Sequence, residues 1–253
     1  MALVAFDLDD TLAPSKSPLP DPVNEALQRL LEHVEVLVIS GGTIEQFHLQ
    51  LLANLHVTDE ALKHMHLMPT CGTRYYLHRD GDWRTQYSYD LDEDTKRRAM
   101  EALESVSRDL GFWVENPAGE IIEDRGSQIT YSALGQEAKL EDKRAWDPTG
   151  EKKSALRDAV APMLPDLEIR SGGSTSVDIT KKGVDKAYGM ERIMEQTGFT
   201  KDQIIFVGDR LDPQGNDYPV KAAGFETIPV TGWEDTIRVI DQIIAERLES
   251  QAG

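Results

Sequence analysis

Short apolar runs that alternate with helical patterns at both ends of the chain constrain its fold most strongly. Residues 4–6 and 35–39 have the composition of buried strands, and leucines recur at helical spacing over 27–34 between them. The same alternation returns near the end, where a helical pattern over 187–196 precedes an apolar run at 203–207. Strands separated by helical crossovers are typical of a parallel sheet with helices on both faces. The sequence therefore predicts an α/β fold built on a doubly wound parallel sheet.

The middle of the chain breaks this rhythm. A hairpin signal at Asp80-Gly81 is followed by short strand patterns that mostly lack helical crossovers, which favours an antiparallel sheet. The expected strands are 120–122, 128–131, 166–171 and 175–180, and the expected helices are 92–109 and 152–163. We interpret residues 89–185 as an α+β cap domain inserted into a core domain made of residues 1–88 and 186–253.

Charge and cysteine content narrow the classes of function. The 253-residue chain carries a formal net charge of −18, which argues against nucleic acid or an anionic membrane as its partner. Cys71 is the single cysteine, so an internal disulfide framework is excluded and a reducing compartment fits. The amino terminus has no basic leader before an apolar core, and no apolar run is long enough to span a membrane. We expect a cytoplasmic protein, monomeric or homodimeric, that acts on a small molecule.

Two carboxylates follow the first expected strand directly. Asp7 and Asp9 are one residue apart, and ligands of open α/β sheets bind at the carboxyl ends of the strands. One aspartate of such a pair can attack phosphorus while the other moves protons and Mg²⁺ neutralises charge. The sequence does not match a calcium-binding EF-hand loop. Counted from Asp7, Leu12 and Pro18 occupy the positions where that loop needs glycine and glutamate. A solvated acidic turn is the simple alternative.

Other candidate site residues lie where core strands end or where the chain re-enters the core. These are Ser40, Gly41, Lys186, Asp209, Asn216 and Asp217. The Ser40 hydroxyl could donate to a phosphoryl oxygen or cap a helix. Asp209 follows an expected strand and offers a second metal carboxylate, whereas Asp217 could equally offset the dipole of a helix that begins there.

The order of these motifs resembles the haloacid dehalogenase superfamily of phosphotransferases, and the resemblance covers essentially the whole chain. An α+β insert after the second core motif is similar to the type-2 cap of that superfamily, a branch that includes Cof-like sugar phosphatases. Within it, the chain is most similar to the phosphomannomutase group. This similarity rests on the segments 172–178, 183–186 and 208–217.

The resemblance implies a role for each site residue. Asp7 is the implied nucleophile, Asp9 the implied acid and base, and Mg²⁺ the implied cofactor. The implied metal ligands are Asp7, the backbone carbonyl of Asp9, and Asp209. Lys186 would hold the transferred phosphoryl group, and Asp217, supported by Asn216, would orient Lys186 or a metal-bound water. The residues implied to bind phosphate or substrate are Ser40, Gly41, Arg125, Ser176 and Asp178.

Several positions depart from the mutase pattern. Gln136 stands where that group has a second cap arginine, and either Lys143 or Arg144 could match a third. Val184 replaces a tryptophan, and Asp10 replaces a glycine. Since a charge-assisted hydrogen bond contributes about 1.5–3 kcal/mol, the loss of an arginine weakens a second phosphate site. We therefore expect a phosphatase acting on a small phosphorylated metabolite such as a sugar phosphate, with a mutase as the alternative.

Two other groups of residues suggest a site but have simpler explanations. His64 and His66 lack a further ligand at metal-binding spacing, so a surface loop is expected there. Trp83 and the pair Tyr75-Tyr76 could stack on a sugar ring, but a cross-strand aromatic pair within the hairpin is favoured.

Overall fold

The chain forms two units that are described separately below. The computed structural model describes residues 1–252, with side chains through Glu249. The core unit is Met1–Ser88 with Asp185–Gly253, and the cap unit is Tyr89–Val184. The boundaries expected from the sequence lie after residues 88 and 185, so the second expected boundary lies one residue later than the structural one.

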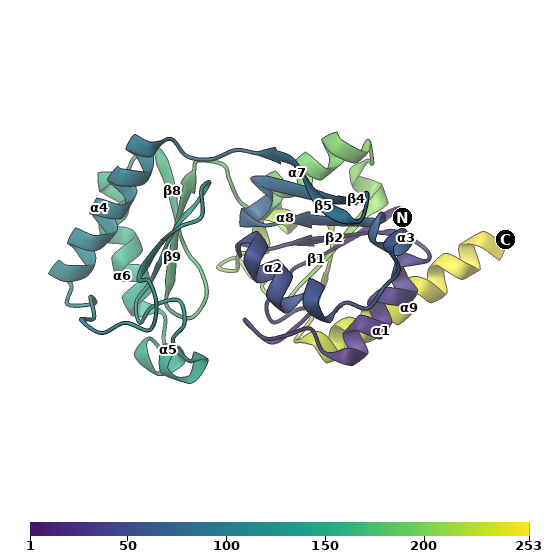
Figure 1. The fold of residues 1–253 in the computed structure, drawn as a ribbon, viewed down its shortest axis with the longest axis horizontal. Coiled ribbons are helices and arrows are strands. Elements are labelled where there is room, and N and C mark those ends of the chain that lie inside the picture. The colour runs from purple at the N-terminus through teal and green to yellow at the C-terminus, as the bar shows by residue number, and fades with distance from the viewer. Residues whose placement is uncertain (253) are drawn as a thin grey trace. The chain divides into compact units, whose positions relative to one another are not determined.

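A seven-stranded sheet forms the centre of the core unit (Figure 1), in the order β11-β10-β1-β2-β3-β4-β5. The parallel strands are β1 (Leu3–Phe6), β2 (Glu35–Ile39), β3 (Met65–Met68), β10 (Ile204–Gly208) and β11 (Glu226–Pro229). The expected hairpin, β4 (Arg74–Arg79) and β5 (Asp82–Ser88), adds two antiparallel strands at one edge. The prediction of an α/β fold with a parallel sheet is confirmed.

Helices pack on both faces of this sheet because alternate residues of β1 point to opposite sides. Val4 and Phe6 share an apolar cluster with residues of α1, α2 and α9, whereas Leu3 and Ala5 share one with residues of α7 and α8. The helices of the core unit are α1 (Asp21–Leu31), α2 (Ile44–Gln50), α3 (Asp59–Leu62), α7 (Lys186–Thr197), α8 (Tyr218–Ala222) and α9 (Trp233–Ala252). The carboxyl ends of the parallel strands therefore meet at one edge, between the helical layers.

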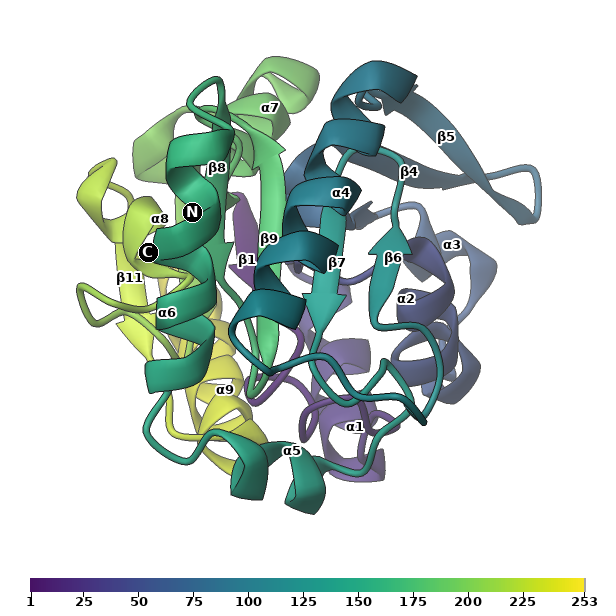
Figure 2. The same cartoon turned by 90° about the vertical axis from the view of Figure 1, so that its left-hand side faces the viewer.

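The cap unit is an antiparallel sheet with helices on one face. Its strands, in the order β6-β7-β9-β8, are β6 (Ile122–Asp124), β7 (Ile129–Ser132), β9 (Ser176–Lys181) and β8 (Leu167–Ser171). In Figure 2 the helices α4 (Glu93–Asp109) and α6 (Glu151–Val160) lie in front of these strands. Ile129 and Tyr131 point toward the helices and join their apolar cluster. Thr130 and Asp178 are opposite each other on β7 and β9, on the polar face of the sheet.

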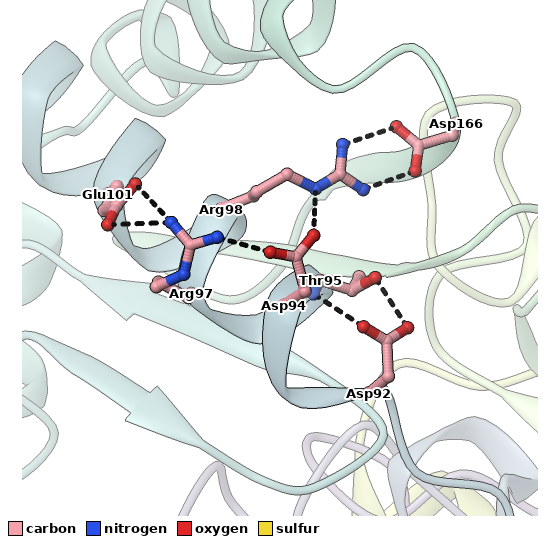
Figure 3. A network of polar contacts seen from close by, with 7 residues as sticks. All are labelled: Asp92, Asp94, Thr95, Arg97, Arg98, Glu101 and Asp166. Carbon is pink, nitrogen blue, oxygen red and sulfur yellow. Dashed lines mark hydrogen bonds and ion pairs between the residues drawn. The ribbon is translucent and has the colours of Figure 1, made fainter.

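The first turn of α4 is fixed by polar contacts that Figure 3 shows. Thr95 donates to Asp92 through its backbone nitrogen, at 2.9 Å, and through its hydroxyl, at 2.8 Å, which makes Asp92 the N-terminal cap. These bonds hold the pKa of Asp92 below its usual value. Arg98 reaches Asp166 at 2.6 Å and so ties the helix to the segment before β8. The ion pairs of α4 are mostly exposed. The N-terminal cap Asp92 and the apolar face of α4 therefore stabilise the helix more than the ion pairs do.

Several elements differ from the sequence-based expectation. α3 and α5 (Leu140–Trp146) were not expected, and β3 replaces part of the surface loop expected around His64 and His66. That expectation is wrong for His66, which is 6% exposed within β3. Its ring lies 2.7 Å from the Tyr75 hydroxyl and 3.1 Å from the Glu35 carboxylate, so two polar partners allow the histidine to be buried.

The hairpin does contain cross-strand aromatic pairs, though with other partners than the ones considered. Tyr75 lies opposite Tyr87, with ring centroids 5.7 Å apart, and Trp83 lies opposite His78 at 5.4 Å. Among the described residues, no helix has both the length and the apolar composition that a membrane crossing requires.

Candidate active site

Asp7 is the first residue after β1, at the edge where the parallel strands end. The residue is 3% exposed, and the backbone nitrogen of Leu8 donates to its Oδ1 at 2.7 Å. Burial raises the pKa of Asp7 well above its usual value; the charge of Lys186 opposes this rise, and that of Asp217 adds to it. A buried carboxylate held by a cation and a backbone amide is oriented for attack on a bound electrophile.

Lys186 is the first residue of α7 and lies between two carboxylates. Its Nζ is 2.6 Å from Asp7 Oδ1 and 2.6 Å from Asp217 Oδ1, and all three side chains are buried. Burial alone would lower the pKa of Lys186, but the two carboxylates outweigh it and hold that pKa above its usual value. Asp185 caps α7 by accepting from the backbone nitrogen of Tyr188 at 3.1 Å, which fixes the helix start that carries the lysine.

Asp209 and Asp217 belong to one loop after β10. Asp217 Oδ2 accepts from the backbone nitrogen of Arg210 at 3.0 Å, so the loop is closed on itself. A side chain at Gly208 would not fit, because its Cβ would lie 2.4 Å from Asp217 Oδ2. The Asp209 carboxylate accepts from the Thr11 hydroxyl at 3.4 Å, which links this loop to the one after β1.

Asp7, Asp209 and Asp217 form a cluster that fits a divalent cation. Each offers a carboxylate oxygen, and these oxygens lie within 4.8 Å of one another. Burial, together with the charge of Asp217, raises the pKa of Asp209 to about 6. A cation bound here would relieve that repulsion, and a site of carboxylate oxygens suits Mg²⁺. The cluster includes Asp217, which was expected only in a supporting role, and does not include the Asp9 side chain.

Ser40 is the first residue after β2 and lies in a tight turn. The Ser40 hydroxyl accepts from the backbone nitrogen of Gly42 at 3.3 Å, and its carbonyl accepts from the backbone nitrogen of Cys71 at 2.9 Å. The first contact is a bond within the turn and not the helix cap considered for this serine, because Thr43 caps α2. It leaves the Ser40 hydroxyl proton available to a phosphoryl oxygen. Gly41 comes next in the turn and is partly exposed. Asn216 is exposed in the loop before α8.

The Asp9 carboxylate points to α2 rather than to the acidic cluster. Its Oδ1 accepts from the backbone nitrogen of Lys16 at 2.8 Å and from Gln50 Nε2 at 3.1 Å. Its Oδ2 accepts from Gln46 Nε2 at 3.2 Å. Asp9 is thus set apart from Asp7 although only one residue separates them.

In the cap unit, the expected phosphate-binding arginine belongs to a mixed polar group. The Arg125 side chain, 9% exposed, donates to Glu123 at 2.7 Å and to Gln136 Oε1 at 3.4 Å. Lys143 is buried and donates to the Gln136 carbonyl at 2.9 Å, whereas Arg144 is exposed. Of the two candidate cations, Lys143 is therefore the one that shares a contact residue, Gln136, with Arg125.

The two cap residues expected on β9 lie on the polar face of the sheet. Asp178 Oδ1 accepts from the Thr130 hydroxyl at 2.8 Å, and both residues are partly or fully buried. Ser176 is two residues earlier on the same strand, opposite Ser132. The strand alternation that buries Val177 and Ile179 in the cap core places Ser176 and Asp178 together on this face.

Comparison with known proteins fits this geometry. A family model for haloacid dehalogenase-like hydrolases matches residues 4–219. The chain belongs to this family. Its match includes the residues that carry the acidic cluster, the lysine and the cap insert.

Curated relatives of this hydrolase-family chain include several phosphomannomutases. The one from Schizosaccharomyces pombe is 26% identical over 250 residues, covering 95% of this chain and 93% of the relative. Human phosphomannomutase 1 is 26% identical over 227 residues, covering 87% of this chain and 83% of the relative. The similarity to phosphomannomutases noted in the sequence is confirmed.

Solved structures of the same fold include a nucleotidase and a hydrolase. A Plasmodium falciparum IMP-nucleotidase superposes with a TM-score of 0.69 at 17% identity, covering 96% of this chain and 70% of the other. A haloacid dehalogenase-like hydrolase from Bacteroides thetaiotaomicron gives a TM-score of 0.62 at 16% identity, covering 96% and 99% of the two chains. At this identity they establish the fold.

Proposed function

We propose that the protein is a Mg²⁺-dependent phosphatase that works through an aspartyl-phosphate on Asp7. The observation that carries this proposal is the Asp7–Lys186–Asp217 triad with Asp209 beside it. A buried carboxylate next to a buried ammonium suits attack on a phosphoryl group whose oxygens the ammonium neutralises. The family match and the cluster of carboxylates support the same chemistry.

The reaction proceeds by two in-line displacements. In the first, an Asp7 oxygen forms a bond to phosphorus as the bond from phosphorus to the substrate oxygen breaks, and Asp9 donates a proton to that oxygen. In the second, Asp9 takes a proton from water, the water oxygen attacks phosphorus, and the bond to Asp7 breaks. Inorganic phosphate leaves, and both aspartates return to their starting states.

The groups around Asp7 hold the phosphoryl oxygens during both steps. Lys186 Nζ and the Ser40 hydroxyl are the donors, with the backbone of Gly41 completing the turn. Asp217 holds Lys186 in place, with Asn216 in the same loop. When bound, Mg²⁺ would neutralise charge as phosphorus is attacked, with Asp7, the Asp9 carbonyl and Asp209 as proposed ligands. Asp217 is a further candidate ligand because its carboxylate is part of the cluster.

A small phosphorylated metabolite, most simply a sugar phosphate, is the proposed substrate. Arg125, Ser176 and Asp178 offer a cation, a hydroxyl and a carboxylate, which suit hydrogen bonds to sugar hydroxyls. The net charge of −18 disfavours nucleic acid and anionic membranes as partners. We further propose a cytoplasmic enzyme that is monomeric or homodimeric.

A sugar-phosphate mutase is the second candidate. The phosphomannomutase relatives favour it, as does the pair of cap cations, Arg125 and Lys143, which both contact Gln136. A mutase must bind a second phosphate in the cap, which calls for strong cationic contacts. Arg125 also pairs with Glu123, and Gln136 supplies a neutral amide. The hydrolase is favoured because it needs no second phosphate site.

Phosphate release from a panel of phosphorylated sugars, with Mg²⁺, tests the proposal. Each substrate is assayed with and without a sugar 1,6-bisphosphate, and the products are followed by ³¹P NMR. We expect inorganic phosphate to appear in both cases. Conversion of mannose 1-phosphate to the 6-phosphate faster than release of phosphate would favour the mutase.

A further inference from the structure

Both carboxylate oxygens of Asp9 accept hydrogen bonds, but Oδ1 accepts more of them than Oδ2. Oδ1 accepts two hydrogen bonds, from the Lys16 backbone at 2.8 Å and from Gln50 at 3.1 Å. Oδ2 accepts one, from Gln46 at 3.2 Å. Since a carboxylate oxygen has two lone pairs, Oδ1 is saturated while Oδ2 keeps one lone pair for a proton.

The two glutamines act as a unit. They are four residues apart on α2, which places them on one face of the helix. Gln46 Nε2 also donates to Gln50 Oε1 at 2.7 Å, and Gln50 Nε2 also donates to the Ser17 carbonyl at 3.2 Å. Both amide protons of each side chain are therefore used, which fixes the rotation of each amide group with its nitrogen toward Asp9.

The start of α2 gives Gln46 its place. Thr43 caps the helix by accepting from the Gln46 backbone nitrogen at 3.4 Å. A Cβ on Gly42 would lie 2.4 Å from Gln46 Oε1, so glycine at 42 leaves the room that the amide occupies. Gln50 is 3% exposed and its carbonyl accepts from the Leu19 backbone at 2.7 Å, which anchors the other end. The turn after Ser40 thus leads directly into the helix that holds Asp9.

We propose that Gln46 and Gln50 are positioning residues that fix the plane of the Asp9 carboxylate so that Oδ2 exchanges the proton. This inference rests on the proposed function, in which Asp9 is the acid and base. In the first step the proton on Oδ2 moves to the leaving oxygen, and in the second Oδ2 takes a proton from water. Without the amides, Oδ1 and Oδ2 become equivalent by rotation, and the proton is presented less often in the productive direction.

The test compares Gln46→Met and Gln50→Met, which keep side-chain length and remove the donors. Gln86→Met is the matched control, because Gln86 is exposed on β5 and donates to the Arg84 carbonyl. Each protein is assayed with a hexose phosphate and with p-nitrophenyl phosphate, whose leaving group departs without a proton. Pre-steady-state bursts report phosphorylation of Asp7, and circular dichroism reports folding.

We expect Gln46→Met to lower kcat for the hexose phosphate by about tenfold or more, with KM changed by less than about twofold. With p-nitrophenyl phosphate, Gln46→Met should keep its burst of p-nitrophenolate and then reach a slower steady state. With this substrate only the second step, attack of water on the aspartyl-phosphate, needs Asp9. Gln50→Met should act in the same way if it folds; Gln46 is only partly buried, so its variant carries the test.

Two results would overturn the proposal. Equal kcat for the hexose phosphate in Gln46→Met and Gln86→Met would remove the positioning role. If Gln46→Met loses the burst with p-nitrophenyl phosphate as fully as the burst with the hexose phosphate, Gln46 supports the general structure of the site and not the position of Asp9. If the unchanged protein releases no phosphate from either substrate, the proposed function itself fails, and the positioning role fails with it.

Discussion

Lys186 Nζ lies 2.6 Å from Asp7 Oδ1, and the two side chains come from segments that the cap insert separates in the sequence. The contact joins the first strand of the sheet to the helix that follows the insert. A second contact of the same length, to Asp217, adds the loop after β10. The charge of one lysine therefore holds three segments of the core unit together at the edge where substrate is proposed to bind.

Replacing the nucleophile should abolish turnover and leave the fold intact. Asp7→Asn keeps the shape of the side chain but cannot form the aspartyl-phosphate, so we expect kcat to fall by about a thousandfold or more. Asp241→Asn, the same change at an exposed residue of α9, is the control. Phosphate release and far-ultraviolet circular dichroism are measured for both. Retention of more than a few per cent of activity in Asp7→Asn would rule out covalent catalysis by this residue.

Removing the buried ammonium should destabilise the core unit. Lys186→Met leaves Asp7 and Asp217 buried without their cation, and breaking such a pair costs about 3–5 kcal/mol in the free energy of unfolding. Urea denaturation at pH 7 measures the loss. Lys63→Met removes an exposed partner of Glu60, and we expect a loss under about 1 kcal/mol for it.

The pH dependence of Lys186→Met checks the cause of that loss. Without the ammonium, burial raises the pKa of Asp7 and the opposing charge of Lys186 is gone. A carboxyl with a raised pKa in the folded state stabilises the fold at low pH and loses that contribution as the pH rises. The deficit of the variant should therefore shrink as the pH is lowered from 7. A deficit that stays constant with pH would mean that lost packing, rather than charge, is responsible.

The sequence predicted the parallel sheet and singled out Asp7, Asp209 and Asp217, because strand ends and acidic motifs are local signals. β3 was missed because His66 interrupts its apolar run, and only the fold reveals that Tyr75 and Glu35 satisfy the ring. Gln46 and Gln50 were missed for a similar reason. Their spacing of four residues on a helix is visible in the sequence, but the carboxylate that they share lies in another segment. Contacts between distant segments are set by packing, which the spacing of residues does not encode.

Metal binding should weaken as the pH falls through about 6. Burial and the charge of Asp217 raise the pKa of Asp209 from 3.8 to about 6, so the metal-free protein holds a proton there that a cation must displace. The contribution of this carboxyl to stability is present below the unfolded pKa and is lost as the pH rises to about 6. Calorimetric titration with Mg²⁺ from pH 5 to 8 tests this. Asp209→Asn should abolish binding, Asp212→Asn should not, and an affinity independent of pH would contradict the assignment.

Adding a cation to the cap should move the enzyme toward mutase activity. Gln136 Oε1 lies 3.4 Å from Arg125, and the Gln136 backbone carbonyl accepts from Lys143, so Gln136→Arg would add a third positive charge next to these two. A charge-assisted hydrogen bond contributes about 1.5–3 kcal/mol, so we expect an increase of about tenfold or more in conversion of mannose 1-phosphate to the 6-phosphate. The assay follows both phosphates by ³¹P NMR with a sugar 1,6-bisphosphate present, and Gln86→Arg is the control. If Gln136→Arg leaves the ratio of isomerisation to hydrolysis unchanged, the residue at 136 does not decide between the two reactions.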